Sequence, residues 1–136
     1  MIHVHSAALK IAIKAKGLDK ILFITDSISA TGLPDGEYML GGLKIVVKNG
    51  VSRVKATGSL AGSTLTMDVA IRNAITNLGL SLKDAVRMAT LNPANALDLP
   101  DHGRLAPNCV ANITVINPKI DILATIVKGE LFYEAK

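Results

Sequence analysis

The stretch ILFITDSISATG, residues 21–32, changes character at one position. Its first five side chains are apolar or β-branched, and they are followed by a single carboxylate, Asp26, and then by small residues and a glycine. A short, continuous apolar run is typical of a parallel β-strand that is covered on both faces. The sequence therefore predicts a buried strand over residues 20–26 that ends in an acid.

The residues before this strand predict a second strand and a helix. Residues 1–5, MIHVH, are expected to be the end of a strand, and residues 7–16 a helix capped by Ser6 and closed by Gly17. Strand, helix and strand in this order form a unit of parallel sheet. We therefore expect residues 1–5 to pair with residues 21–25.

The remainder of the chain predicts an inserted antiparallel element, two helices and a set of short strands. Asn49-Gly50 lies between LKIVVK and VSRVK and indicates a tight hairpin, within an insertion at about residues 36–57. An apolar stripe predicts a helix from residue 63 to Gly79, and a capping box at Ser81–Asp84 begins another that Asn92-Pro93 ends.

The final third predicts strands, with a hairpin turn at Lys128-Gly129-Glu130. These assignments give an α/β fold.

Size and composition restrict the class of protein. The chain has 136 residues, 49% of them apolar and only 3% aromatic, with a net charge of +4 and one cysteine. An aliphatic core with spread lysines argues against a nucleic-acid surface and favours a small acidic or phosphorylated ligand. No apolar run is long enough for a membrane span, and a lone Cys109, which we interpret as structural, suits a cytoplasmic setting.

The position of Asp26 suggests chemistry. Active sites of parallel-stranded barrels and open sheets form at the carboxyl ends of the strands, where a carboxylate can move a proton between water and a leaving group. Asp is also common as a turn or cap residue after strands. Position alone leaves both interpretations open.

Two further features could bind a ligand. His3 and His5 alternate at the end of the first strand, but a metal site needs a third ligand, and the remaining histidine, His102, lies in a loop beside Asp101. These histidines could equally be satisfied structural residues. The segment GSLAGST, residues 58–64, offers backbone amides to an anion or forms a plain turn before a helix.

Several segments together resemble the N-acetylglucosamine-6-phosphate deacetylases, which are metal-dependent amidohydrolases. They are IHVHSAALKIAIKAKG from residue 2, ILFITDSISATGLPDGEYMLGG from residue 21, GSLAGSTLTMDVAIRN from residue 58 and TLNPANALDL from residue 90. The resemblance extends from residue 2 to about residue 131.

The resemblance implies a fold and a set of roles. It implies a (β/α)8 barrel, of which this chain carries about the last two strands and their helices, and the C-terminal strands of a small β-sandwich domain. Residues 1–98, with the inserted hairpin, would belong to the barrel, and residues 99–136 to the small domain. Asp26 would be the catalytic residue, a general base that later protonates the departing amine. His3 would contact the sugar phosphate substrate, and Leu60, Ala61 and Gly62 would form a loop that touches it.

The resemblance also implies a divalent metal, zinc or iron. Its ligands in the family, a glutamate and two histidines, come from strands that would precede residue 1, so we expect this chain alone to hold no metal and to be inactive. Strand 21–25 would then have an open edge, which is a template for pairing with another chain and predicts a homo-oligomer. Two alternatives are a non-catalytic α/β module that self-associates and an amidohydrolase that acts on a cyclic amide.

Overall fold

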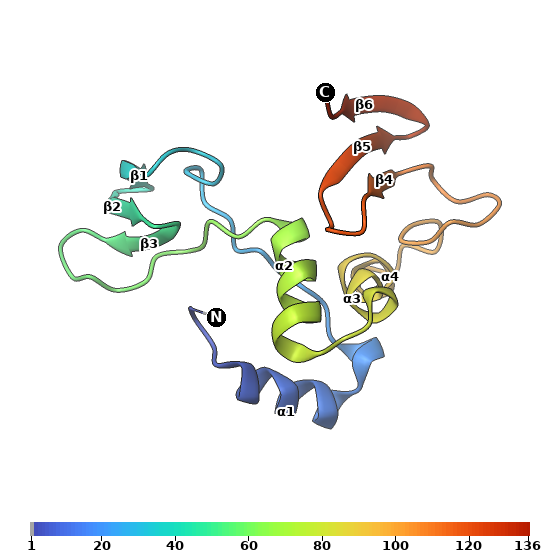
Figure 1. The fold of residues 1–136 in the computed structure, drawn as a ribbon, viewed down its shortest axis with the longest axis horizontal. Coiled ribbons are helices and arrows are strands. Elements are labelled where there is room, and N and C mark those ends of the chain that lie inside the picture. The colour runs from blue at the N-terminus through green and yellow to red at the C-terminus, as the bar shows by residue number, and fades with distance from the viewer. Residues whose placement is uncertain (1) are drawn as a thin grey trace.

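Two antiparallel sheets lie apart at the upper left and upper right of Figure 1, and the helices lie between and below them. The computed structural model describes residues 2–136. The helices are α1 (Ser6–Lys16), η1 (Leu18–Lys20), α2 (Met67–Asn73), η2 (Ala74–Leu78), α3 (Leu82–Ala89) and α4 (Leu91–Ala96). The strands are β1 (Gly36–Leu40), β2 (Leu43–Lys48), β3 (Val51–Val54), β4 (Ile113–Ile116), β5 (Ile122–Val127) and β6 (Glu130–Glu134). The predicted mixed α/β class is confirmed.

The predicted hairpin is part of the first sheet, which has the order β1-β2-β3. Asn49 and Gly50 both have positive φ, 50° and 68°, as a tight two-residue turn requires. The carboxylate of Asp35 accepts hydrogen bonds from both of their N–H groups. The inner face of this sheet contributes to a core cluster of buried apolar residues: Ile28, Ala30, Ile45, Val47 and Ala61. The segment that follows Asp26 is thus packed on the sheet.

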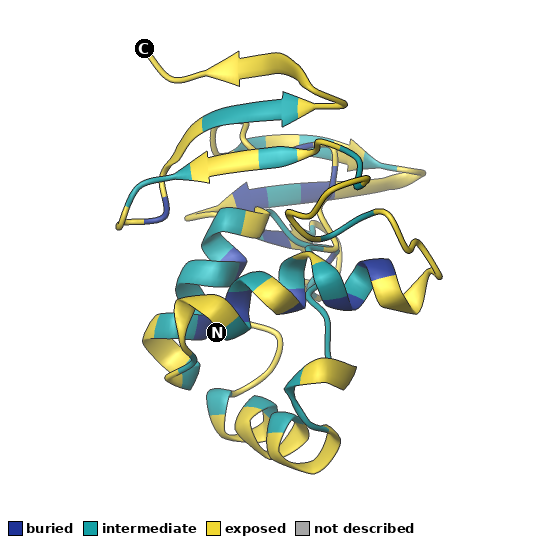
Figure 2. Ribbon diagram, turned by 90° about the vertical axis from the view of Figure 1, so that its right-hand side faces the viewer, coloured by how far each residue is buried: buried dark blue, intermediate teal, exposed yellow. Residues whose placement is uncertain are grey.

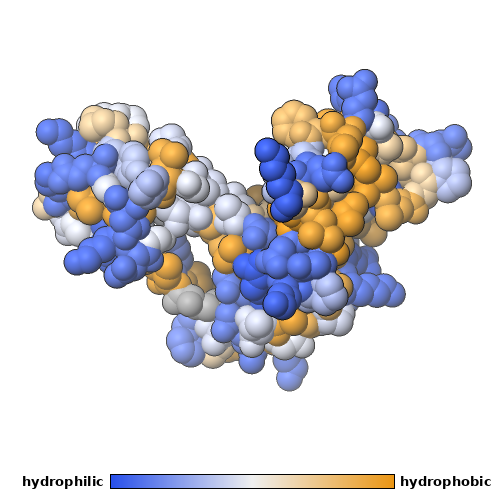
Figure 3. All heavy atoms as spheres, turned by 45° about the horizontal axis from the view of Figure 1, so that its top comes forward, coloured by the Kyte–Doolittle hydropathy of each residue, from blue (hydrophilic) through white to orange (hydrophobic). Residues whose placement is uncertain are grey.

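The second sheet, β4-β5-β6, carries much exposed apolar surface (Figures 2 and 3). The predicted turn at Lys128-Gly129 is confirmed, with φ of 52° and 87° at its two residues. All residues of β6 are exposed, including Phe132 at 80%. The accessible surface of the molecule is 9236 Å², whereas a compact protein of this mass exposes about 6,800 Å². The fold is therefore open and leaves apolar side chains in contact with solvent.

The strand expected at residues 20–26 is not formed, nor is the strand expected at residues 1–5 over residues 2–5, since residue 1 lies outside the described residues. Residues 2–5 have no regular structure, and residues 21–25 run extended without a ladder before Ser27 forms an isolated parallel bridge with Ser63. The burial prediction is also wrong at Ile24, which is 73% exposed. A strand needs a backbone neighbour, and here the helices α3 and α4 take that place. Phe23 N–H, for example, donates to the carbonyl of Met88 at 3.1 Å.

The ends of the helices follow local signals, with small differences. His5 rather than Ser6 caps α1, because its Nδ1 accepts from the N–H of Ala7 at 3.2 Å. Gly17 closes that helix with φ of 82°, as expected. The helix predicted from residue 63 begins at Met67, because residues 63–66 remain extended beside the segment after Asp26.

The later helices follow the same rule. The apolar-stripe helix ends in the single π-helical turn η2 with a left-handed Gly79, and Ser81 caps α3 as predicted. The expected end at Asn92-Pro93 is wrong, since the break lies at Thr90. Pro93 instead lies in the first turn of α4. Backbone N–H groups in a first turn have no acceptor within the helix, so the N–H that proline lacks costs no hydrogen bond there.

Asn92 is the polar centre of this region and is only 4% exposed. Its Nδ2 donates to the carbonyls of Leu18 at 2.7 Å and Ile21 at 2.5 Å, and its Oδ1 accepts from Nε of Arg87 at 3.2 Å. One buried side chain therefore ties α3 and α4 to the start of the segment that leads to Asp26.

We expect the substitution Asn92→Ala to lower the free energy of unfolding by about 2–4 kcal/mol, because it leaves the carbonyls of two half-buried residues, Leu18 and Ile21, without this donor. Urea denaturation of the variant and the parent measures this difference. The matched control is Asn95→Ala in the same helix, at an exposed position. An equal loss of stability in both variants would contradict the assignment.

Candidate active site

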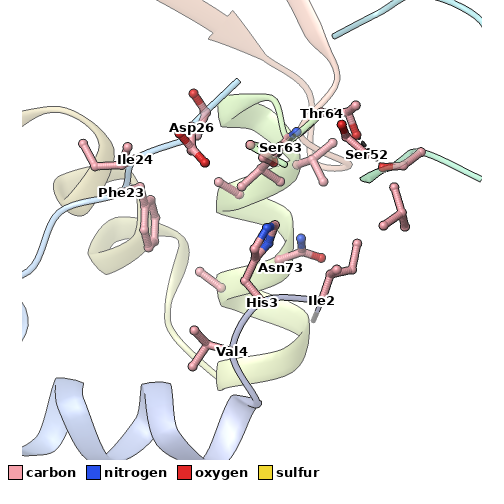
Figure 4. Close-up of a pocket in the computed structure, with 18 of the residues that line it drawn as sticks. Ile2, His3, Val4, Phe23, Ile24, Asp26, Ser52, Ser63, Thr64 and Asn73 are labelled. Atoms are coloured by element: carbon pink, nitrogen blue, oxygen red, sulfur yellow. Dashed lines mark hydrogen bonds between the residues drawn. The ribbon is translucent and has the colours of Figure 1, made fainter. Parts of the chain in front are cut away.

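A mainly apolar cavity of about 540 Å³ lies between the N-terminal segment, the extended segment that ends in Asp26, and α2 (Figure 4). The turn before β3 and residues 62–65 complete its wall. Three residues singled out in the sequence line it together: His3, Asp26 and Gly62. The structure thus brings an acid, an imidazole and a glycine backbone to one place, although they are distant in the sequence.

Asp26 is exposed at the end of the extended segment, and its backbone is left-handed with φ of 51°. Asp is one of the few non-glycine residues that tolerate this region. The carbonyl of Asp26 accepts from the N–H of Ser63 at 2.8 Å. In Figure 4, Asp26 and Ser63 lie on the same side of the cavity. An exposed carboxylate at a cavity wall can exchange a proton with a bound molecule.

The histidines have separate environments. His3 is exposed and lies beside Asn73 of α2 in Figure 4. His5 caps α1 and does not line the cavity. His102 also lies away from the cavity, 2.7 Å from Asp101, where its hydrogen bond lowers the pKa of the Asp101 carboxyl. Of the three imidazoles, therefore, that of His3 is the one available to a ligand in this cavity.

The loop of Leu60, Ala61 and Gly62 meets the cavity only through Gly62. Leu60 is half-buried and forms an antiparallel bridge with Arg53. Ala61 is 8% exposed, belongs to the core cluster and donates its N–H to the carbonyl of Ser52 at 3.2 Å. Leu60 and Ala61 are therefore engaged with the first sheet and its core, and contact of the loop with a substrate stays a prediction.

Ser52 and Asn73 also line the cavity and were not singled out in the sequence, whereas Thr64 belongs to the segment 58–64 that was. Ser52 is 3% exposed, and its Oγ is the one buried side-chain polar atom without a hydrogen-bond partner among the described residues. Its place at an inward position of β3 is a weak sequence signal, because serine there interrupts apolar alternation. Asn73 is a polar residue between apolar positions of a helix, which is an equally weak signal.

A metal ion needs more ligands than this cavity provides by itself. His3 and Asp26 are the lining residues of the ligand types His, Cys, Asp and Glu. Throughout residues 2–136, no three residues of these types lie close enough to hold an ion together. Zinc in proteins usually takes three or four protein ligands. The described residues thus do not by themselves fit a complete metal site.

Of the helices described, none combines the length and apolarity needed to cross a bilayer.

Known sequences resemble this chain over nearly its whole length. It is 37% identical over 130 residues to N-acetylglucosamine-6-phosphate deacetylase of Lysinibacillus sphaericus, covering 96% of this chain and 33% of that protein. It is 35% identical over 130 residues to a putative N-acetylgalactosamine-6-phosphate deacetylase of Escherichia coli K12, covering 95% of this chain and 77% of that protein. The chain therefore spans one third of the length of the first relative and three quarters of the second.

Solved structures share the fold. N-acetylglucosamine-6-phosphate deacetylase of Thermotoga maritima superposes with a TM-score of 0.91 at 34% identity, covering 98% of this chain and 37% of that one. A mutant deacetylase of Mycobacterium smegmatis in complex with N-acetyl-D-glucosamine-6-phosphate gives 0.89 at 39% identity, covering 96% and 35%. These deacetylases combine a (β/α)8 barrel with a β-sandwich domain.

The amidohydrolase family model matches residues 1–132. Amidohydrolases are hydrolytic enzymes that generally use a divalent metal. The match includes the acid-bearing segment, every wall of the cavity and nearly all of both sheets. On this match, the chain belongs to the amidohydrolase family.

Proposed function

We propose that the protein removes the acetyl group of N-acetylglucosamine 6-phosphate to give glucosamine 6-phosphate and acetate. The observation that carries the proposal is the placement of Asp26, His3 and Gly62 on one cavity in a chain whose relatives have this name. The net charge of +4 favours an anionic substrate. We place the reaction in the cytoplasm, where the free thiol of Cys109 stays reduced.

Asp26 is the proton carrier in this mechanism. Its carboxylate takes a proton from the water that attacks the amide carbonyl, and a bond forms between the water oxygen and the carbonyl carbon. When the carbon–nitrogen bond breaks, Asp26 returns that proton to the amine nitrogen. Acetate and the free amino sugar leave, and the carboxylate is restored. His3, which lines the same cavity, is proposed to contact the sugar phosphate.

The substrate loop would act through its backbone. Because Leu60 pairs with the first sheet through its backbone and Ala61 is buried in the core cluster, we assign the contact of this loop with substrate to the backbone at Gly62. The metal of the family, for which we propose zinc or iron, would need ligands that the described residues do not supply. We therefore expect residues 1–136 by themselves to be inactive, and activity is to be measured on the whole polypeptide that its gene encodes.

We expect Asp26→Asn to lower kcat by about 10²–10⁴-fold, because the amide cannot carry the proton. Asn tolerates the left-handed backbone, so the fold should be unchanged. Acetate release from N-acetylglucosamine 6-phosphate measures kcat. The control is Asp98→Asn, which alters another exposed aspartate with positive φ, 52°, away from the cavity. Full activity of Asp26→Asn would refute the proposed role.

A second candidate substrate is N-acetylgalactosamine 6-phosphate. Three relatives are named for that substrate, including the one that this chain covers to 77%. The two sugars differ only in the orientation of one hydroxyl group. We expect a higher kcat/KM for the gluco sugar and no turnover of a cyclic amide such as dihydroorotate. A reversed preference would assign the protein to the galacto substrate, and turnover of the cyclic amide would refute both.

We also propose that the protein forms a homo-oligomer. The support is the exposure of large apolar side chains on both halves of the chain, Ile24 and Phe132 among them. Burial of such surface is the usual driving force of association. Sedimentation velocity over a wide range of concentrations should give a multiple of the single-chain mass, and a monomer at every concentration would contradict the proposal.

A further inference from the structure

We propose that Gly62 and Ser63 are positioning residues that hold Asp26 in its left-handed backbone conformation and thereby aim its carboxylate. The inference rests on the proposed function, because it presumes that Asp26 carries the proton. It differs from a role of this loop in touching substrate. The contacts involved are all within the protein, and they can be measured without any ligand.

Ser63 is bonded to both sides of the residue that follows Asp26. Its N–H donates to the carbonyl of Asp26 at 2.8 Å, and its carbonyl accepts from the N–H of Ile28 at 2.9 Å. This pair of bonds is the parallel bridge between Ser27 and Ser63. The carbonyl of Ser63 also accepts from Oγ1 of Thr31 at 3.3 Å. A non-glycine residue with φ of 51° is costly and persists where surrounding bonds hold it.

Ser63 can come this close only because residue 62 is glycine. Gly62 has φ of 55°, and a Cβ at this position would lie 2.3 Å from Cγ2 of Ile28 and 3.3 Å from the carbonyl oxygen of Asp26. The first distance requires that Ile28 or the backbone at Gly62 shift, and the second is tighter than an ordinary contact. We therefore expect a side chain at position 62 to displace residues 26–28 from residue 63.

The loop itself is fixed to the first sheet. Ala61 N–H donates to the carbonyl of Ser52 at 3.2 Å, and Val54 N–H donates to the carbonyl of Ser59 at 2.8 Å. The sheet thus holds the loop, and the loop holds Asp26. Displacement of a reacting group by about 1 Å costs on the order of 100-fold in rate. Gly62 therefore acts on kcat through Asp26 and not through a side-chain contact with substrate.

The test compares two glycines of nearly equal φ. Gly62→Ala and Gly41→Ala place the same strain on the backbone, since Gly41 has φ of 57°, but a Cβ at Gly41 meets nothing within 4 Å. In Gly62→Ala we expect amide exchange at Ile28 and Ser63 to accelerate by at least about tenfold. We expect kcat to fall by about 100-fold with a smaller change of KM. Gly41→Ala should leave exchange at these amides and kcat at parental values.

A compensating substitution tests the contact itself. Ile28→Leu moves the branch from Cβ to Cγ and so removes Cγ2, whereas Ile28→Val keeps it. We expect the double variant Gly62→Ala with Ile28→Leu to regain slow exchange at Ser63 and part of kcat. The double variant with Ile28→Val should stay as impaired as Gly62→Ala alone. If alanine at position 62 only destabilised the fold, the two double variants would be equally impaired.

Three results would overturn the inference. The first is native amide exchange together with native kcat in Gly62→Ala. The second is a lost kcat with native amide exchange in that variant, which would assign the loop to substrate contact. The third is an equal effect of Gly41→Ala on exchange and kcat. If Gly62→Ala does not fold, Thr31→Val decides, because it removes one bond to the carbonyl of Ser63 and should accelerate the same amides. A parent protein that does not hydrolyse the sugar phosphate would refute the deacetylase activity. Amide exchange at Ile28 and Ser63 would still decide whether Gly62 and Ser63 hold the backbone of Asp26.

Discussion

The close approach of the Ser63 backbone to residues 26–28 is the constraint on which the site depends. Two hydrogen bonds, at 2.8 and 2.9 Å, join segments that are far apart in the sequence. They require glycine at position 62, because a Cβ there would overlap Ile28. They also place Ile28 in the core cluster beside Ala61. The same contact therefore closes the first sheet onto the chain, forms one wall of the cavity and fixes the residue that we propose as the proton carrier.

The other end of the acid-bearing segment is held in a different way. Asn92 donates to the carbonyl of Ile21, and Phe23 donates to the carbonyl of Met88, so helices satisfy backbone groups that a strand neighbour would satisfy in a sheet. Between these two anchors Ile24 has no cover and is 73% exposed. The segment is extended because both ends are fixed, and not because it belongs to a ladder. An extended backbone with both ends bonded can present a terminal carboxylate with a defined direction.

The sequence predicted what local chemistry determines. Turns at Asn49-Gly50 and Lys128-Gly129, the ends of helices at Gly17 and Gly79 and the cap at Ser81 depend on one or two residues, and all were correct. The paired strands at residues 1–5 and 20–26 were wrong, since pairing depends on a neighbour that the pattern of one segment does not specify. For the same reason the sequence could assign Leu60, Ala61 and Gly62 only to one common loop. The packing alone shows that Ala61 is buried in the core and that Gly62 faces the cavity. The burial of Ser52 likewise depends on the sheet and the loop that cover it.

Asp26 and Gly62 differ in how far fold and chemistry can be separated. At Asp26 the backbone demands a residue that tolerates positive φ, and Asn meets that demand as well as Asp does, so a change of chemistry need not change the fold. At Gly62 two demands coincide, a positive φ and the absence of a Cβ, and the second concerns the distance to Asp26 itself. Relief of the strain in φ alone would leave the overlap with Ile28. The same few atoms therefore determine the geometry of the Asp26 carboxylate and the stability of the contact with residue 63. A substitution of Ile28 that restores this contact must also restore the geometry of the carboxylate.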